Sequence, residues 1–414
     1  MLHPTGRHLG QRVLAISTLA LAITLAVNAE AADVDPVVLT FSTVGDSRQD
    51  PVSPDGTTPL ATMSGQDKTW LQNTKAWARI QRSIQAQKAS LLFFNGDMIM
   101  GYGLAGPAKS TSVADVVASD LMAFYRQYGF WRGMVAPAME TGTYIVPVPG
   151  NHEVQSKPLG KKAQVENENA WRANMGDLIL DTVRFKAIVG VDATNVNVGN
   201  NAAFDSLNSD QSQLSYSFDV GDSHFAVVNT DPVGKDATAP AAWLSSDLSS
   251  AKSRGAKHFF VFGHKPAFTY SYAPAGAPPT PAGGLDVNPG PRDNFWNVIE
   301  TYAATYFCGH EHIFNMAQPK GSAWQVLVGA GGSPFDSKYG DASATSGLTP
   351  NTDRSYSWAT VAIRKSGKVD ITAYGFSDSY GPTQVLKQVT LAVGSGAGAT
   401  ALVSTGTPDG TGAT

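Results

Sequence analysis

Apolar side chains recur at helical spacing in four segments of the chain. In residues 67–89, Trp70, Trp77, Ile80 and Ile84 fall on one stripe, which predicts an amphipathic helix packed on a core. The same spacing predicts three further helices, in residues 112–131, 239–255 and 293–304. Packing alone explains these stripes, so they carry no functional prediction.

Short apolar runs with strand character lie between the helices, in residues 37–44, 90–95, 143–149, 224–230, 258–262 and 305–308. Strands that alternate with helices are joined by crossover connections, so the pattern predicts an α/β fold with substantially parallel strands. The final third contains further runs with few helices between them, in residues 323–332, 355–364, 368–376 and 384–393. We expect these strands to complete a second sheet rather than to form an independent domain.

Three segments interrupt this pattern. Residues 155–215 are polar and predict an insertion, and the Pro/Gly-rich residues 271–292 predict an irregular surface loop. Residues 394–414 are of low complexity, which predicts a disordered tail. The remaining pattern predicts one domain over residues 36–393.

The amino-terminal residues 1–31 are typical of a secretory signal peptide. Arg7 and Arg12 precede an apolar run from Val13 to Val27, and small residues precede a cleavage point after Ala31. The alternative, an uncleaved anchor helix, is disfavoured because the run is short for a membrane span. We therefore expect an exported protein, periplasmic or secreted.

Composition, net charge and cysteine count argue against several classes of partner and site. Hydrophobic residues make up 42% of the 414 residues, which is enough for a large core. The formal net charge of -4 gives no electrostatic reason to expect nucleic acid or an anionic membrane as partner. Cys308 is the only cysteine, so a disulfide framework and a thiolate zinc site are excluded, and its apolar neighbours predict a buried, inert thiol.

Five predicted strands end in a glycine followed by a potential metal ligand. They read LTFSTVGD, LLFFNGD, YIVPVPGNHE, HFFVFGH and TYFCGHEH, and they supply Asp46, Asp97, Asn151, His152, His264, His310 and His312. In open α/β sheets, ligands bind at the carboxyl ends of the strands, where side chains from several strands meet. The two other histidines of the predicted mature chain, His224 and His258, begin strands instead, and we predict structural roles for them.

Oxygen and nitrogen donors without thiolate suit Zn, Mn or Fe rather than Ca. The number of donors exceeds what one tetrahedral ion needs. A pair of transition-metal ions about 3.5–4 Å apart, sharing one carboxylate, would use them.

The ordered motifs GDSR, NGDMIMGY, GNHE, GHKP and GHEHIF resemble the calcineurin-like metallophosphoesterase superfamily, in the branch nearest the purple acid phosphatases. The resemblance covers residues 37–332 and implies two packed mixed β-sheets flanked by helices, in four layers. It implies that Asp97 bridges two ions and that His152 stays unligated, facing the leaving group. For the other ligands it implies Asp46 and His312 at the first ion, and at the second ion Asn151, His264 and His310.

Two positions depart from the family pattern. Most members have Asp-x-His in the first motif, but here Arg48 takes the histidine position, and a guanidinium has no lone pair to give a metal. Arg48 is expected either to contact a phosphate through two hydrogen bonds or to form a salt bridge that orients Asp46 or a loop. The tyrosine ligand of purple acid phosphatases is replaced by Met100, which leaves Tyr102 or water to complete the first site.

The resemblance implies a metal-dependent phosphoric ester hydrolase that cleaves small phosphomonoesters or phosphodiesters. The runner-up substrate class is nucleotides or the head groups of phospholipids. A metal-bound hydroxide would attack phosphorus, and His152 would protonate the leaving group. The alternative is a metal- or phosphate-binding protein of the same fold with little or no turnover. The missing histidine in the first motif keeps this alternative open.

Overall fold

The computed structural model describes residues 34–48, 72–199, 204–269, 283–335, 355–392 and the backbone of 402–403. The chain divides into two units, Met1–Pro36 and Val37–Thr414, and the fold described below belongs to the second. The predicted signal peptide 1–31 lies outside the described residues. So does the predicted tail, apart from residues 402–403.

The first sheet combines the amino-terminal strands with the last strands of the described chain. Strand β1 pairs in parallel with β2, and β2 with β3, while β13 joins the other edge of β1 in an antiparallel ladder. The spatial order is β16 (Leu402–Val403), β15 (Gln384–Leu391), β14 (Val369–Ser377), β13 (Ser355–Arg364), β1 (Val37–Val44), β2 (Leu91–Phe94) and β3 (Tyr144–Pro147).

The second sheet is built from the middle of the chain. Its central strands β8, β9, β10 and β12 are parallel neighbours, and antiparallel strands flank them on both sides. The spatial order is β11 (Phe314–Ala317), β12 (Gln325–Val328), β10 (Thr305–Cys308), β9 (His258–Phe262), β8 (Ser223–Val227), β7 (Tyr216–Val220) and β6 (Thr194–Asn197). A separate small hairpin pairs β4 (Gln155–Ser156) with β5 (Lys162–Ala163).

Phenylalanine side chains join the inner faces of the two sheets. Phe93 of β2 stacks on Phe262 of β9 with ring centroids 3.6 Å apart, and Phe41 of β1 meets Phe260 edge to face at 4.9 Å. Aromatic rings carry large apolar areas into the interior, so these contacts bury apolar surface between the sheets. The α/β fold with two packed sheets, expected from the sequence, is confirmed.

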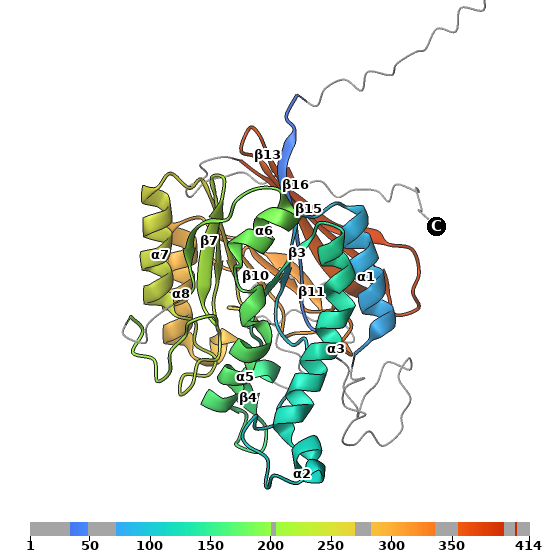
Figure 1. The fold of residues 1–414 in the computed structure, drawn as a ribbon. Coiled ribbons are helices and arrows are strands. Elements are labelled where there is room, and N and C mark those ends of the chain that lie inside the picture. The colour runs from blue at the N-terminus through green and yellow to red at the C-terminus, as the bar shows by residue number, and fades with distance from the viewer. Residues whose placement is uncertain are drawn as a thin grey trace, which may run out of the picture. The chain divides into compact units, whose positions relative to one another are not determined.

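Helices cover the outer faces of both sheets (Figure 1). Helices α1 (Thr74–Ala86) and α3 (Asp120–Glu140) pack on the first sheet, where Trp77 and Trp131 both meet Phe94. Helices α7 (Ala241–Ser253) and α8 (Pro289–Thr301) share a core with the second sheet. The predicted stripe on α1 is confirmed at Trp77, Ile80 and Ile84, which are buried, while Trp70 lies outside the described residues.

Three predictions need correction. Residues 112–131 form two helices, because Ser119 ends α2 (Val113–Ala118) and caps α3, and Val113 is therefore exposed. Helix α8 begins at Pro289, inside the predicted loop 271–292, because proline suits the first turn of a helix. Strand β12 completes the second sheet as expected, but β13, β14 and β15 extend the first.

The polar region 155–215 contributes to the core as well as to the surface. Helix α4 (Asn151–Val154) precedes it, and the region itself forms α5 (Val165–Met175), the short helix η2 (Gly176–Leu178) and α6 (Thr182–Val189). Trp171 and Phe185 from this region are fully buried in the main hydrophobic cluster. A second short helix, η3 (Leu285–Val287), precedes α8.

None of the helices in the described part of the chain combines the length and apolar character that a membrane-spanning segment needs.

Candidate metal centre

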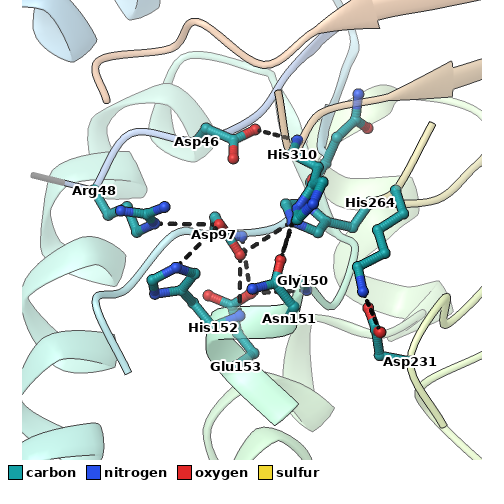
Figure 2. A network of polar contacts seen from close by, with 12 residues as sticks. Asp46, Arg48, Asp97, Gly150, Asn151, His152, Glu153, Asp231, His264 and His310 are labelled. Atoms are coloured by element: carbon teal, nitrogen blue, oxygen red, sulfur yellow. Dashed lines mark hydrogen bonds and ion pairs between the residues drawn. The ribbon is translucent and has the colours of Figure 1, made fainter. Parts of the chain in front are cut away.

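The carboxyl ends of β1, β2, β3, β9 and β10 meet along one edge of the two sheets, and the loops that leave them are tied together. The Asp46 N–H donates to Gly96 O at 3.0 Å, which links the first two loops. The Gly309 N–H donates to His264 O at 2.8 Å, which links the last two. The seven residues that the sequence singled out at the five strand ends therefore lie in one place. Figure 2 shows the side chains of Asp46, Asn151, His152, His264 and His310 around Asp97, and His312 lies next to Asp46.

Glycines let these loops approach so closely. A Cβ on Gly309 would lie 2.3 Å from Asp46 Oδ2, and a Cβ on Gly96 would lie 2.6 Å from His264 Nδ1. Three of the residues that follow such glycines, Asp46, Asp97 and His310, have positive φ angles of 61°, 54° and 74°. Non-glycine residues rarely adopt this conformation, and its concentration here is typical of a functional site.

Four side chains form what we call the second-ion group: Asp97, Asn151, His264 and His310. Asn151 Oδ1 lies 2.8 Å from His264 Nε2 and 2.9 Å from His310 Nδ1. His264 Nε2 lies 3.2 Å from Asp97 Oδ1 and 3.2 Å from His310 Nδ1. Four donor atoms from four loops, which follow β2, β3, β9 and β10, thus converge on one point.

Most of these atoms face one another as acceptors. His264 Nδ1 lies 2.7 Å from the Asn95 carbonyl, to which it donates, so Nε2 carries a lone pair. Asn151 donates through Nδ2 to the Tyr102 hydroxyl, which turns its Oδ1 toward the imidazoles. Burial lowers the pKa of both His264 and His310, so both rings are neutral. Buried acceptors that face one another need a cation between them, and this donor set fits Zn, Mn or Fe.

A second set of side chains, the first-ion group, differs because it contains a cationic side chain. The group consists of Asp46, Asp97 and His312. The Arg48 guanidinium lies between its members, with Nε 3.2 Å from Asp97 Oδ2 and Nη2 3.4 Å from His312 Nε2. His312 Nε2 is also 3.6 Å from Asp46 Oδ1. The salt bridge of Arg48 is thus formed with Asp97, on the loop that follows β2.

Charges on Arg48 and Asp97 stabilise each other. Burial lowers the pKa of Arg48, but the carboxylates of Asp97 and Asp46 outweigh it, and the net pKa is raised. Burial raises the pKa of Asp97, while the rings of His152 and His264 and the Arg48 guanidinium lower it, and the net pKa lies below its usual range. Asp97 is therefore ionised and acts as the common contact of both groups.

His152 and Tyr102 lie on one side of Asp97. His152 Nδ1 is 2.5 Å from the Met100 carbonyl, and its Nε2 is 3.7 Å from Asp97 Oδ2. The Tyr102 ring packs on the His152 ring with centroids 3.6 Å apart. Burial and the Asp97 charge raise the pKa of Tyr102, so it is a neutral phenol, and its hydroxyl contacts Asn151 in the second-ion group.

Two further interactions support the loops around the centre, and both are harder to predict from the sequence. The carboxylate of Glu153 accepts hydrogen bonds from the backbone N–H groups of Gly150, Asp97, Met98 and Ile99, which fixes the Asp97 loop against α4. The buried ion pair between Lys265 Nζ and Asp231 Oδ1, at 2.6 Å, was not predicted. The lysine in GHKP and the aspartate after the run 224–230 were its only signals.

The geometry defines a buried centre of carboxylate, amide and imidazole donors at the strand ends of an α/β sandwich. In the described residues, Asp46, Asp97 and His264 present ligand atoms within 4.8 Å of one another. A model of the calcineurin-like phosphoesterase family matches residues 70–314, more than half of the chain. The chain belongs to the calcineurin-like phosphoesterase family, and its class is that of a metal-dependent phosphoric ester hydrolase.

Solved structures of three phosphatases are similar in fold. PhoD is 14% identical with a TM-score of 0.50, over 91% of this chain and 73% of its own. Purple acid phosphatase PPD1 from yellow lupin is 15% identical with a TM-score of 0.49, over 85% of this chain but only 54% of its own. A dimetal phosphatase from Danio rerio is 11% identical with a TM-score of 0.48, over 84% of this chain and 99% of its own. No curated protein sequence matches the chain.

Proposed function

We propose that the chain is an exported phosphoesterase that hydrolyses small phosphomonoesters or phosphodiesters at the centre described above. The observation that carries the proposal is the convergence of the second-ion group, in which Asn151 Oδ1 and His264 Nε2 face each other at 2.8 Å as acceptors. A bound Zn, Mn or Fe ion would supply Lewis-acid chemistry there, polarising the phosphoryl group and making water more acidic.

The protein side chains supply position and charge. Asp97 accepts the His152 backbone N–H at 3.1 Å and the Arg48 Nε–H at 3.2 Å, so it holds both residues close to the place where the ester would react. Arg48 is permanently charged and has further N–H groups with which it can bind phosphoryl oxygens. Its buried position excludes water from these contacts and strengthens them.

His152 is our candidate for the general acid. Burial and the Arg48 charge lower its pKa, so its Nε2 is unprotonated in the substrate-free chain. The proton that it would give to the leaving group therefore has to arrive with the substrate, whose phosphate anion favours the imidazolium form. A substrate that binds as a monoanion would deliver this proton directly.

Hydrolysis of nitrophenyl mono- and diester phosphates tests the proposal. The mature chain, expressed without residues 1–31, would be stripped of metal and loaded separately with Mn, Zn or Fe. We expect metal-dependent turnover that Asp97→Asn lowers by about 10²- to 10³-fold. The ratio of the monoester rate to the diester rate narrows the substrate class. Absence of turnover on both esters with every metal would favour the alternative, a binding protein of the same fold. The presence of Arg48 at the histidine position of the first motif supports that alternative.

Export is tested separately, because the predicted signal peptide bears on location and not on chemistry. We expect the full-length chain, expressed in a bacterium, to be recovered outside the cytoplasm with its amino terminus after Ala31. Recovery of the uncleaved chain in the membrane fraction would favour the anchor-helix alternative.

A further inference from the structure

Arg48 is held rigidly in the first-ion group. Only 9% of the residue is exposed. Its carbonyl accepts a hydrogen bond of 2.7 Å from Ser333 Oγ, and its backbone forms a β-bridge with Gln72. Backbone and side chain are therefore both fixed, so the guanidinium is a built part of the centre rather than a surface side chain that reaches in.

The neighbours of the guanidinium are the residues that would otherwise hold the first ion. His312 Nδ1 lies 2.5 Å from the Pro334 carbonyl and donates to it, so Nε2 carries the lone pair that faces Arg48 Nη2. Asp97 Oδ2 faces Arg48 Nε at 3.2 Å. Asp46 is fully buried and contributes a second negative charge next to the guanidinium. One cation, the guanidinium, thus contacts two of these groups, Asp97 and His312, and lies in the field of the third, Asp46.

The two halves of the centre therefore differ in whether a positive charge is already present among the ligands. The first-ion group has its positive charge in the form of Arg48, whereas the second-ion group has acceptors that converge on a point. A metal ion in the first-ion group would have to share Asp97 and His312 with a guanidinium. It would also lie within a few ångströms of that positive charge, where repulsion in a buried site is strong. The first-ion group does not fit a metal ion, and the second-ion group does.

We propose that this phosphoesterase binds a single transition-metal ion, in the second-ion group, and that the Arg48 guanidinium takes the place of the other ion of the family's pair. The proposal rests on the proposed function and specifies its active site. Arg48 cannot acidify water, since it has no open coordination position. It supplies a fixed charge and paired N–H donors for the phosphoryl oxygens, as an arginine does in other phosphoryl-transfer sites.

Metal content per chain, measured by mass spectrometry of the element after loading with excess Mn or Zn and desalting, tests the proposal. We expect about one ion per wild-type chain and about two per Arg48→His chain, because histidine restores a neutral donor to the first-ion group. The matched control is Arg254→His. Arg254 also pairs with a carboxylate, Asp219 at 2.9 Å, but on the opposite edge of the second sheet, and its replacement should leave the content at about one.

Each outcome separates this inference from the proposed function. About two ions in the wild type, or about one in a folded Arg48→His chain, would overturn the role given to Arg48 and leave the phosphoesterase intact. No bound ion together with no turnover would overturn both. If Arg48→His does not fold, electron paramagnetic resonance of Mn-loaded wild type decides instead. An isolated-ion spectrum supports the proposal, and an exchange-coupled pair contradicts it.

Discussion

Two clusters of buried histidine and carboxylate lie at opposite edges of the second sheet. The metal centre lies at the carboxyl ends of the strands. The other cluster, here called the His224 cluster, consists of Asp219, His224, Asp247 and Arg254. Both His224 ring nitrogens contact carboxylates there, Nδ1 with Asp219 at 2.5 Å and Nε2 with Asp247 at 2.9 Å. Burial and residue types alone would not distinguish the two.

Hydrogen-bond complementarity does distinguish them. In the His224 cluster, each carboxylate oxygen has a donor: Arg254 and Asn195 reach Asp219, and Ser217 reaches Asp247 at 2.9 Å. Burial lowers the pKa of His224, but the two aspartates outweigh it and the net pKa is raised, so the ring carries a proton between them. In the second-ion group, acceptors face acceptors and the imidazole pKa values are lowered. A closed network stabilises the fold, whereas an open one binds a cation.

Asp97→Asn should produce the largest change, because Asp97 contacts both halves of the metal centre. We expect kcat to fall by about 10²- to 10³-fold, in the range known for loss of one electrostatic stabiliser in an active site. Initial rates on a nitrophenyl ester measure this. The same substitution at Asp219, in the His224 cluster, is the matched control and should leave kcat unchanged in the folded protein.

His224→Gln should have the opposite effect to Asp97→Asn: it should lower stability and leave kcat unchanged. Removing the protonated ring leaves two buried carboxylates without the positive charge between them, which we expect to lower the free energy of unfolding by about 3 kcal/mol. Urea unfolding measures this. His258→Gln is the control on neighbouring strand β9, with a smaller expected loss, because burial lowers the pKa of His258 and its ring is neutral. Weaker metal binding by His224→Gln would contradict the separation of the two clusters.

Tyr102→Phe tests whether the Tyr102 hydroxyl orients Asn151 in the second-ion group. The Tyr102 hydroxyl accepts from Asn151 Nδ2 and so orients the Asn151 oxygen. Its loss should weaken Mn affinity by about tenfold, the lower end of effects seen when partners of metal ligands are removed. Isothermal titration calorimetry gives the affinity, and Tyr125→Phe on the exposed face of α3 serves as control. An unchanged affinity would mean that Asn151 is held without its partner.

The pH dependence of stability is the smallest expected effect. The folded pKa of His224 lies above its unfolded value of about 6.5, so its contribution is complete below that value. This contribution is lost as pH rises through the folded pKa. The difference in unfolding free energy between wild type and His224→Gln should shrink by about 1.4 kcal/mol for each pH unit of rise within that window. Urea midpoints from about pH 6 to about pH 9 would show it. A difference that grows with pH would be contrary to a protonated ring.

Much of the fold and site could be predicted because they rest on local pattern. The runs 37–44 and 258–262 gave strands β1 and β9, and glycine followed by a ligand placed Asp46 and His264 at strand ends. Pairing between distant segments could not be predicted. Strand β13 lies beside β1 through a register that joins Phe41 to Val361, and neither segment alone specifies its partner. The contact of Arg48 with Asp97 and His312 likewise exists only after the loops converge.

The most direct test of the account is a crystal of the mature chain soaked in Mn, examined by anomalous diffraction. The account predicts one strong peak bounded by Asp97, Asn151, His264 and His310, with Arg48 still in contact with Asp97 and no peak beside His224. A peak between Asp46 and His312 with Arg48 displaced would contradict the single-ion centre. An empty second-ion group would contradict the metal centre itself.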